Sequence, residues 1–254
     1  MATILRHLTV VIPFRRGSQR FADKAFCEVL GKTLIEHAVE NARTISDRPP
    51  VLTAPQADLD FLKERITIEG VALVASSESC ACATERLVEI APRLPGDDLL
   101  LSLPIDEPAI KSEEIVKAIK NTRHTIDAQH ALTFYCDFFT EADYRSPLSA
   151  KVVIDQQDKL LYMSRTVIPS TKSGSVDPAA LKKNVGAFVF SRHFLARLAE
   201  LKSQATSLDI VEGLEQLRWL ELGLAVRCEK IAHVGFGVDV PEQVALLEER
   251  MRCR

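Results

Sequence analysis

Two features of this sequence predict an α/β fold with a doubly wound, mostly parallel sheet. In the first hundred residues, apolar strand patterns alternate four times with amphipathic helix patterns, as in sheets whose strands are joined by helices. The fourth strand pattern, residues 98–103, is almost unbroken in its apolar run, which is typical of a strand buried on both faces. A basic loop follows the first strand, and such sheets bind ligands at the carboxyl ends of their strands.

Each element of the first half is predicted by its own pattern. Thr33 and Glu36 form a capping-box pattern at the start of a helix whose buried stripe includes Ile35, Ala38 and Val39. The predicted strands are residues 8–12, 51–53, 71–74, 98–103 and 131–135. The predicted helices are residues 34–42, 57–66, 84–94 and 112–122.

The second half changes character, because two apolar stretches flank a short polar turn and predict a hairpin, residues 150–154 and 159–163. The remaining strands are predicted at 184–190 and 225–229, and the remaining helices at 192–201, 208–222 and 241–251. Pro241 is expected to start the last helix, since proline suits a first helical turn. No repeat or low-complexity linker is visible, so we expect one domain over residues 1–254, with a lobe built around the hairpin.

Composition excludes several classes of protein. The formal net charge is -3, so a global basic field for nucleic acid is absent. No apolar run is long enough to span a bilayer, and the first residues lack a signal-peptide pattern, so we expect a cytoplasmic protein without membrane segments. The six cysteines have no CxxC pair or zinc-ligand spacing and are expected to be reduced thiols.

The loop after the first strand concentrates cations around a small turn. Gly17 and Ser18 lie at its centre, where backbone N–H groups can face an anion. The loop has neither the GxxxxGK[ST] nor the GxGxxG pattern. It therefore indicates an anion site, with a solvated basic loop as the alternative. Its cations are Arg15, Arg16, Arg20 and Lys24.

Acidic residues follow two predicted strands. Asp106 and Glu107 precede Pro108 at the end of the fourth strand, where a metal-bound nucleotide is expected in this kind of sheet. A turn before a helix explains the same residues. Asp239 precedes Pro241, and its alternative reading is a helix N-cap.

Seven ordered segments resemble the 3-deoxy-D-manno-octulosonate (KDO) cytidylyltransferases, also called CMP-KDO synthetases. The family opening IPARYxSTRLPGKPL corresponds to IPFRRGSQRFADKAF, its GTERLAE to ATERLVE, and its VNVQGDEP to LSLPIDEP. Its AVKVV and YFSRATIP correspond to AKVV and YMSRTVIP. Its LEQLRVLE corresponds to LEQLRWLE, and its PGVDTPEDL to FGVDVPEQV. The resemblance runs from about residue 10 to residue 251, nearly the whole chain.

The resemblance implies a Rossmann-like nucleotidyltransferase fold and transfer of CMP from CTP to an acidic sugar, with release of pyrophosphate. It further implies a Mg²⁺ cofactor and a homodimer. Residues 8–135 would form the nucleotide-binding half, and residues 145–254 the half for acceptor binding and dimerisation, including the hairpin lobe. The implied catalytic residues are Arg15, Arg20, Lys24, Asp106 and Asp239, of which Asp106 and Asp239 would bind the metal.

The implied ligand contacts fall into two groups. The nucleotide would be bound by Arg15, Gly17, Ser18, Arg20, Lys24 and Arg86. The acceptor would be bound by Arg165, Asn184, Glu215 and Gln216. For Arg86 the alternative is a surface ion pair, and for the helix that carries Glu215 and Gln216 it is a solvated polar face.

The departures from the family pattern cluster where base and acceptor are handled. Pro104 and Ile105 replace a glutamine and a glycine, and Asn184 replaces a histidine. Ala22 and Asp23 replace a proline and a glycine, which adds a negative charge beside the loop lysine. Two alternatives therefore stay open: CMP transfer to another ulosonic acid or a small phosphonate, and a catalytically degenerate nucleotide-binding protein.

Overall fold

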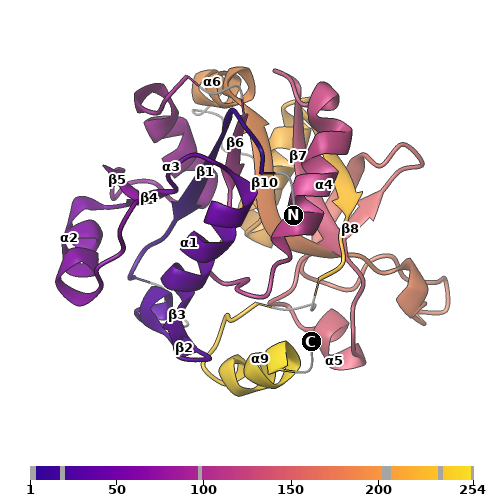
Figure 1. Ribbon diagram of the computed structural model, residues 1–254. Coiled ribbons are helices and arrows are strands. Elements are labelled where there is room, and N and C mark those ends of the chain that lie inside the picture. Colours follow the sequence, from indigo (N-terminus) through magenta and orange to yellow (C-terminus); the bar gives the residue numbers. More distant parts are fainter. Residues whose placement is uncertain (1–3, 18–20, 97–98, 202–206, 234–236, 253–254) are drawn as a thin grey trace. The chain divides into compact units, whose positions relative to one another are not determined.

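The computed structural model describes residues 4–17, 21–96, 99–201, 207–233 and 237–252 (Figure 1). The chain forms two compact units. The first unit consists of residues 1–117 together with the returning C-terminal segment, residues 237–254. The second unit consists of residues 118–236.

The first unit is built on four parallel strands in the order β6-β1-β4-β5. Strand β1 is central, since Val11 is in register with Val51 on one side and with Ser102 on the other. Strands β4 and β6 are both buried along their whole length, and for β6 the apolar run at 98–103 predicted this. The strands are β1 (Leu8–Pro13), β4 (Val51–Ala54), β5 (Ala72–Ala75) and β6 (Leu99–Ser102).

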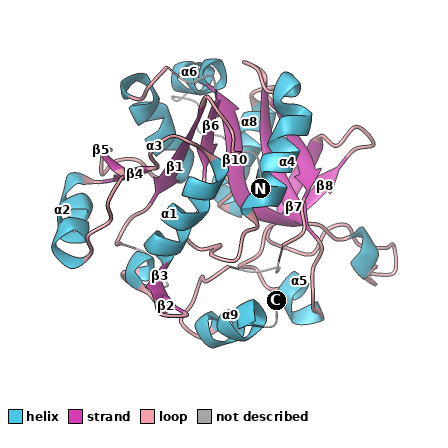
Figure 2. Cartoon of the chain, in the orientation of Figure 1, coloured by secondary structure: helices cyan, strands magenta, loops and turns pink. Residues whose placement is uncertain are grey.

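Helices cover this sheet, and α1, α2 and α3 each contact its strands (Figure 2). Helix α1 starts with the predicted capping box: Thr33 Oγ1 accepts from the Glu36 backbone N–H, and the Glu36 carboxylate accepts from the Thr33 N–H. The helices of this unit are α1 (Leu34–Ile45), α2 (Gln56–Arg65), α3 (Ala83–Ile90) and α9 (Gln243–Arg252), with short 3₁₀ helices at Lys24–Phe26 and Ala91–Arg93. Helix α4 (Ser112–Thr122) begins in this unit and ends in the second, which also contains 3₁₀ helices at Arg123–Thr125 and Pro178–Ala180.

The C-terminal helix returns to the N-terminal part of the first unit. In Figure 1 the yellow helix α9 lies beside the indigo hairpin of β2 (Glu28–Val29) and β3 (Lys32–Thr33). A Glu248 oxygen accepts a hydrogen bond from the Leu30 N–H at 2.8 Å. Helix α9 begins at Gln243 and not at Pro241, so the predicted start was wrong by two residues.

The side chain of Gln243 explains this later start. Its Oε1 accepts from the backbone N–H groups of Asp239 and Val240, at 2.6 and 3.1 Å. These bonds hold the chain before Gln243 in a turn instead of a helix. Asp239 is therefore not the N-cap of this helix.

The second unit has a mixed sheet in the order β11-β7-β10-β8-β9. Strands β11 and β7 are parallel, and the other pairs are antiparallel. The predicted hairpin is present as β8 (Lys151–Ile154) and β9 (Leu160–Ser164). The other strands are β7 (His130–Cys136), β10 (Lys183–Ser191) and β11 (Ala225–Lys230).

The predicted helix at 208–222 is two helices, α7 (Ser207–Glu212) and α8 (Gln216–Glu221). Gly213 separates them with φ +62°, a left-handed conformation that ends helices and that favours glycine. The remaining helices of this unit are α5 (Glu141–Arg145) and α6 (Arg192–Leu201).

The fold class predicted from the sequence is confirmed: a mostly parallel sheet flanked by helices, with a small antiparallel hairpin. The described cysteines, Cys27, Cys80, Cys82, Cys136 and Cys228, are free thiols, as expected. None of the helices in the described ranges is both long and apolar enough to cross a membrane.

Candidate active site

A lysine ammonium lies between two carboxylates in the first unit. Lys24 Nζ is 2.7 Å from Asp106 Oδ2 and 3.6 Å from Asp239 Oδ1. Asp106 follows strand β6, and Lys24 follows the loop that leaves strand β1. Because parallel strands end at one edge of a sheet, two distant parts of the sequence meet here, as the sequence predicted.

The charge on Lys24 is set by two opposing effects. Burial by itself lowers the pKa of Lys24, but the carboxylates of Asp106 and Asp239 outweigh burial, so its pKa is raised above the ordinary value. Only 13% of the lysine side chain is exposed. The ammonium therefore stays charged and balances part of the negative charge of the two carboxylates.

The segment that carries Asp239 is docked on the segment that carries Asp106. The Val238 N–H donates to the Asp106 carbonyl at 2.8 Å. A Cβ on Gly237 would lie 2.5 Å from the same carbonyl oxygen, closer than real Cβ atoms approach. Glycine is thus required at residue 237, and this close approach brings Asp239 to Asp106.

A cavity of about 250 Å³ opens beside these three charged groups. Its wall comes from strand β1 and the following loop, the start of helix α3, and the two acidic segments. It is lined by Pro13, Phe14, Arg15, Lys24, Ala81, Cys82, Ala83, Arg86, Ile105, Asp106 and Asp239. Ile105 is buried and makes this wall apolar at a position where the family motif has glycine.

The predicted basic loop is only partly within the described ranges. Ser18 and Arg20 lie outside the described residues. Arg15 is exposed and lines the cavity, and Gly17 is exposed. Lys24 and Arg15 are thus brought to the same cavity as Asp106 and Asp239.

The negative charge that Asp23 adds to this loop is paired. Arg16 Nε donates to Asp23 Oδ1 at 2.9 Å, and Asp23 stabilises the guanidinium and raises the pKa of Arg16. The sequence predicts an added negative charge beside the loop lysine. The structure shows that the neighbouring loop cation neutralises much of it.

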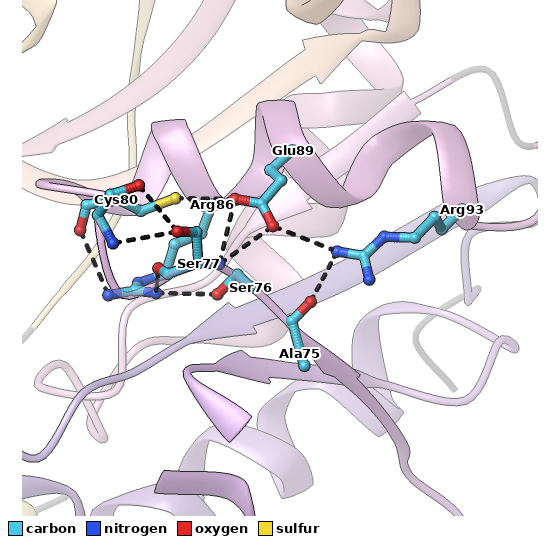
Figure 3. A network of polar contacts seen from close by, with 8 residues as sticks. Ala75, Ser76, Ser77, Cys80, Arg86, Glu89 and Arg93 are labelled. Atoms are coloured by element: carbon cyan, nitrogen blue, oxygen red, sulfur yellow. Dashed lines mark hydrogen bonds and ion pairs between the residues drawn. The ribbon is translucent and has the colours of Figure 1, made fainter. Parts of the chain in front are cut away.

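Arg86 lines the cavity from helix α3, but its guanidinium is mainly engaged by the preceding loop (Figure 3). Nη1 donates to Ser76 Oγ at 2.9 Å and to the Ser77 carbonyl at 3.0 Å, and Nη2 donates to the Cys80 carbonyl at 3.4 Å. The side chain is buried, so the surface ion pair considered from the sequence is wrong.

Glu89 completes this network from the next turn of α3. Both of its carboxylate oxygens accept from the Ser77 N–H, and Cys80 Sγ donates to one of them at 3.2 Å (Figure 3). Arg86 and Glu89 together fix the loop that leads into the cavity wall at Ala81 and Cys82. A contact between Arg86 and nucleotide stays a prediction.

The donor set at the cavity fits a hard divalent cation. Asp106 and Asp239 present carboxylate oxygens to a single point, which the Lys24 ammonium approaches, and carboxylates are preferred ligands of Mg²⁺. Within the described residues there is no group of three or more His, Cys, Asp or Glu side chains that could hold a metal. The remaining ligands would have to be phosphate oxygens and water, as is usual for Mg²⁺ in phosphoryl-transfer sites.

Arg165, a predicted acceptor ligand, is engaged within the second unit by backbone carbonyls. Nε donates to the Glu212 carbonyl at 3.0 Å and Nη2 to the Gly213 carbonyl at 3.3 Å. Nη1 donates to the carbonyls of Pro147 and Leu148. These bonds join the end of β9 to the break between α7 and α8, so a carboxylate acceptor would have to compete with them.

The other predicted acceptor residues also have local roles. Asn184 Nδ2 donates to Thr133 Oγ1 at 3.0 Å, and its Oδ1 accepts from the Gly186 N–H at 2.8 Å, where the β7–β10 register shifts. Gln216 is buried at the first turn of α8, and Glu215 precedes it as the N-cap residue. Their acceptor contacts stay predictions.

Sequence reasoning missed three features of this site. It gave no role to Asp58 and Phe61 of α2, which contact Arg16, or to the backbone wall at residues 81–83. A signal was available only for the pair of Arg16 and Asp23, which depart from the family motif with opposite charges on the two sides of one loop. It does not identify Asp58. No local signal identifies Phe61, because helix α2 is distant in sequence.

The basic loop after β1 and the acidic segment after β6 lie at the carboxyl ends of parallel strands, where open α/β sheets bind their ligands. The chain belongs to the cytidylyltransferase family, whose model matches residues 9–231. This confirms the prediction of a CTP-dependent nucleotidyltransferase.

Curated relatives extend the match to nearly the full chain. The chain is 32% identical to the 3-deoxy-manno-octulosonate cytidylyltransferase of Geobacter sulfurreducens, over 97% of this chain and 100% of the relative. It is 30% identical to the enzyme of the same name from Protochlamydia amoebophila, over 94% and 92% of the two chains. The family resemblance stated from the sequence is thereby confirmed.

Solved structures share the fold. The structure of a CMP:2-keto-3-deoxy-manno-octonic acid synthetase complexed with CTP superposes with a TM-score of 0.80 at 24% identity, over 97% of this chain and 98% of that chain. The 4-diphosphocytidyl-2C-methyl-D-erythritol synthase of Anaerococcus prevotii has a TM-score of 0.61 at 13% identity, over 96% of each chain.

Proposed function

We propose that this protein transfers CMP from CTP to the acidic sugar 3-deoxy-D-manno-octulosonate and releases pyrophosphate. The observation that carries the proposal is the convergence of Lys24, Asp106 and Asp239 beside one cavity. The names of the relatives, which match over nearly their full length, support this acceptor.

In the proposed reaction, an acceptor oxygen attacks the α-phosphorus of CTP, and the bond from that phosphorus to the bridging oxygen breaks. The acceptor hydroxyl proton leaves to solvent, and pyrophosphate departs. Such a transfer needs positioning and charge neutralisation more than covalent help. Arg15, Arg20 and Lys24 would bind the phosphates and stabilise the negative charge that develops on pyrophosphate.

Enzymes of this family generally use a divalent metal ion, and we propose that here it is Mg²⁺ held by Asp106 and Asp239. When bound, the ion would neutralise phosphate charge and favour ionisation of the acceptor hydroxyl. Lys24 approaches both carboxylates, so its ammonium would have to share or leave this position when the metal and nucleotide bind.

On the nucleotide side, Gly17 and Ser18 would offer backbone or hydroxyl groups to the triphosphate, and Arg86 would shape the wall near the base. On the acceptor side, we propose contacts from Arg165, Asn184, Glu215 and Gln216. The corresponding assignment of residues 8–135 to nucleotide and 145–254 to acceptor and dimerisation is part of this proposal.

A second candidate is CMP transfer to a different acidic acceptor, such as another ulosonic acid or a small phosphonate. The engagement of the Asn184 amide by Thr133 and Gly186 favours it, because this residue replaces a histidine of the family motif. A site that loses hydrogen-bonding groups discriminates differently among hydroxyl-rich substrates.

A homodimer is also proposed. Leu161 of β9 and Ile210 and Val211 of α7 are 57%, 70% and 82% exposed, and exposed apolar side chains of this kind can be covered by a partner subunit. The bonds from Ser164 and the Arg165 N–H to the Glu212 carboxylate link β9 to α7. A cytoplasmic location and the absence of nucleic-acid partners stay predictions from the sequence.

The test is pyrophosphate release from CTP and Mg²⁺ with KDO, other ulosonic acids and phosphonates. Turnover with KDO is expected, and Asp106→Asn should lower it by about a hundredfold or more, since a metal ligand is removed. The matched control is Asp60→Asn on the exposed face of α2, which should not change turnover. Turnover with another acceptor alone would support the second candidate. Release that is unaffected by Asp106→Asn would contradict the site assignment.

A further inference from the structure

The two sides of the basic loop are joined at Arg16 and Asp23. The Asp23 N–H donates to the Arg16 carbonyl at 3.3 Å. The Arg16 side chain adds Nε to Asp23 Oδ1 at 2.9 Å and Nη2 to Asp23 Oδ2 at 3.5 Å. We call this contact between Arg16 and Asp23 the neck of the loop; it consists of one backbone hydrogen bond and a bidentate ion pair. Lys24 is the residue that follows Asp23 in the sequence.

Asp23 has an unusual backbone conformation. Its φ is 51° and its ψ is 27°, in the left-handed region that favours glycine and that aspartate tolerates better than most residues. The Asp23 carbonyl then accepts from the Phe26 N–H at 2.8 Å and closes the 3₁₀ turn that begins at Lys24. The direction of the Lys24 side chain is thus set by the residue that Arg16 holds.

Helix α2 contacts Arg16 on one side of the neck and, on the other side, the turn that follows Asp23. The Arg16 N–H donates to Asp58 Oδ2 at 3.0 Å, and the Arg16 guanidinium carbon lies 3.4 Å from the centre of the Phe61 ring. The Phe26 ring meets the same Phe61 ring edge-on, with centroids 5.2 Å apart. One aromatic side chain therefore contacts the residue before the loop and the turn after it.

We propose that Arg16, Asp23 and Phe61 are positioning residues that fix the backbone at Lys24, so that its ammonium reaches the cavity beside the two site carboxylates. The inference rests on the proposed function, because it assigns Lys24 to the bound triphosphate. Arg16 and Asp23 stand where the family motif has tyrosine and glycine, so the ion pair supplies here what glycine supplies through its conformational freedom.

A double-mutant cycle tests this role. Arg16→Met keeps an unbranched side chain on Phe61 but removes the charge, and Asp23→Asn keeps a residue that tolerates the left-handed backbone. Each should raise the KM for CTP about fivefold with kcat changed less than about twofold, and the double variant should also stay near fivefold because the two residues act as one unit.

Three variants serve as controls. The Arg65 guanidinium carbon also lies near the Phe61 ring, 4.6 Å from the ring centre. Arg65→Met removes this guanidinium and should leave the KM for CTP unchanged. Phe61→Leu should raise KM like Arg16→Met, and Phe61→Tyr should restore it because the aromatic face is kept.

The outcomes separate this inference from the proposed function. Effects that multiply in the double variant, or a lower melting temperature with unchanged KM, would overturn the positioning role and leave a structural one. If the wild-type protein turned over none of the acceptors, the same cycle would be read from the calorimetric Kd for CTP with Mg²⁺. Fivefold, non-multiplying changes in that Kd would support the positioning role even though the proposed function had failed.

Discussion

Two lysines with little exposed surface, Lys24 in the first unit and Lys151 in the second, have opposite surroundings. Lys24 lies between the carboxylates of Asp106 and Asp239 beside a cavity. Lys151 is fully buried, and its ammonium donates to three backbone carbonyls, those of Ser146, Ser149 and Arg165, at 2.6 to 2.8 Å. None of these three acceptors is a carboxylate.

The pKa values of the two lysines move in opposite directions for this reason. The pKa of Lys24 is raised, because the carboxylates outweigh burial. Burial, and then the nearby charge of Arg165, lower the pKa of Lys151 to about 8. Carboxylates around an ammonium are also ligands for a metal ion, whereas the three carbonyls around Lys151 join backbone segments through its ammonium. The first arrangement suits a substrate site and the second suits a structural one.

The largest expected effect is a loss of catalytic activity when Lys24 is substituted. Lys24→Met should lower kcat/KM for CTP by about a hundredfold or more, because a positioned charge is lost from the phosphates in the transition state. The measurement is steady-state pyrophosphate release at saturating acceptor. The matched control is Lys32→Met, an exposed lysine paired with Glu40, which should not change kcat/KM.

The opposite pattern is expected for the second lysine. Lys151→Met should lower the free energy of unfolding by about 3 kcal/mol, because three buried carbonyls lose their donor. Urea denaturation measures this change, and Lys24→Met should lower the same quantity by less than about 1 kcal/mol because its partners can be solvated from the cavity. Equal destabilisation by Lys24→Met and Lys151→Met would contradict the assignment of a structural role to Lys151 and a substrate-binding role to Lys24.

A smaller effect, the pH dependence of stability, tests the lowered pKa of Lys151. With a folded pKa of about 8 and an ordinary value of 10.5, Lys151 binds fewer protons in the folded than in the unfolded state between these values. The stability of the wild type relative to Lys151→Met should therefore rise with pH, by about 2.5 kcal/mol from pH 7 to pH 10. Denaturation at several pH values measures the difference, and a difference that stays constant would mean that the carbonyls keep the ammonium charged.

Local patterns predicted much of the fold. The apolar run at 98–103 and the capping box of Thr33 and Glu36 are signals within a few residues, and both elements formed as expected. The break at Gly213 was missed, because apolar spacing continues through it while the backbone turns. Lys24 and Asp106 were brought together because they follow parallel strands that end at one edge of the sheet. Asp239 joins them because residues 237 and 238 dock on the Asp106 backbone.

Interactions between distant side chains were the part that sequence did not predict. The clamp of Arg86 on the loop at 76–80 and the contact of Phe61 with Arg16 depend on where helices α3 and α2 pack. Arg165 and Asn184 show the same limit, since a motif identifies the residue and not its hydrogen-bond partners. These partners follow from tertiary geometry alone.

The return of residues 237–254 to the first unit has a consequence for biosynthesis. A ribosome makes strands β1, β4, β5 and β6, with Lys24 and Asp106, long before it makes Asp239. Domains generally fold as units during translation, but this unit must wait for the whole second unit to be synthesised. A nascent chain stopped between residues 106 and 239 carries the ammonium and one carboxylate, so such a truncated product lacks half of the proposed metal site.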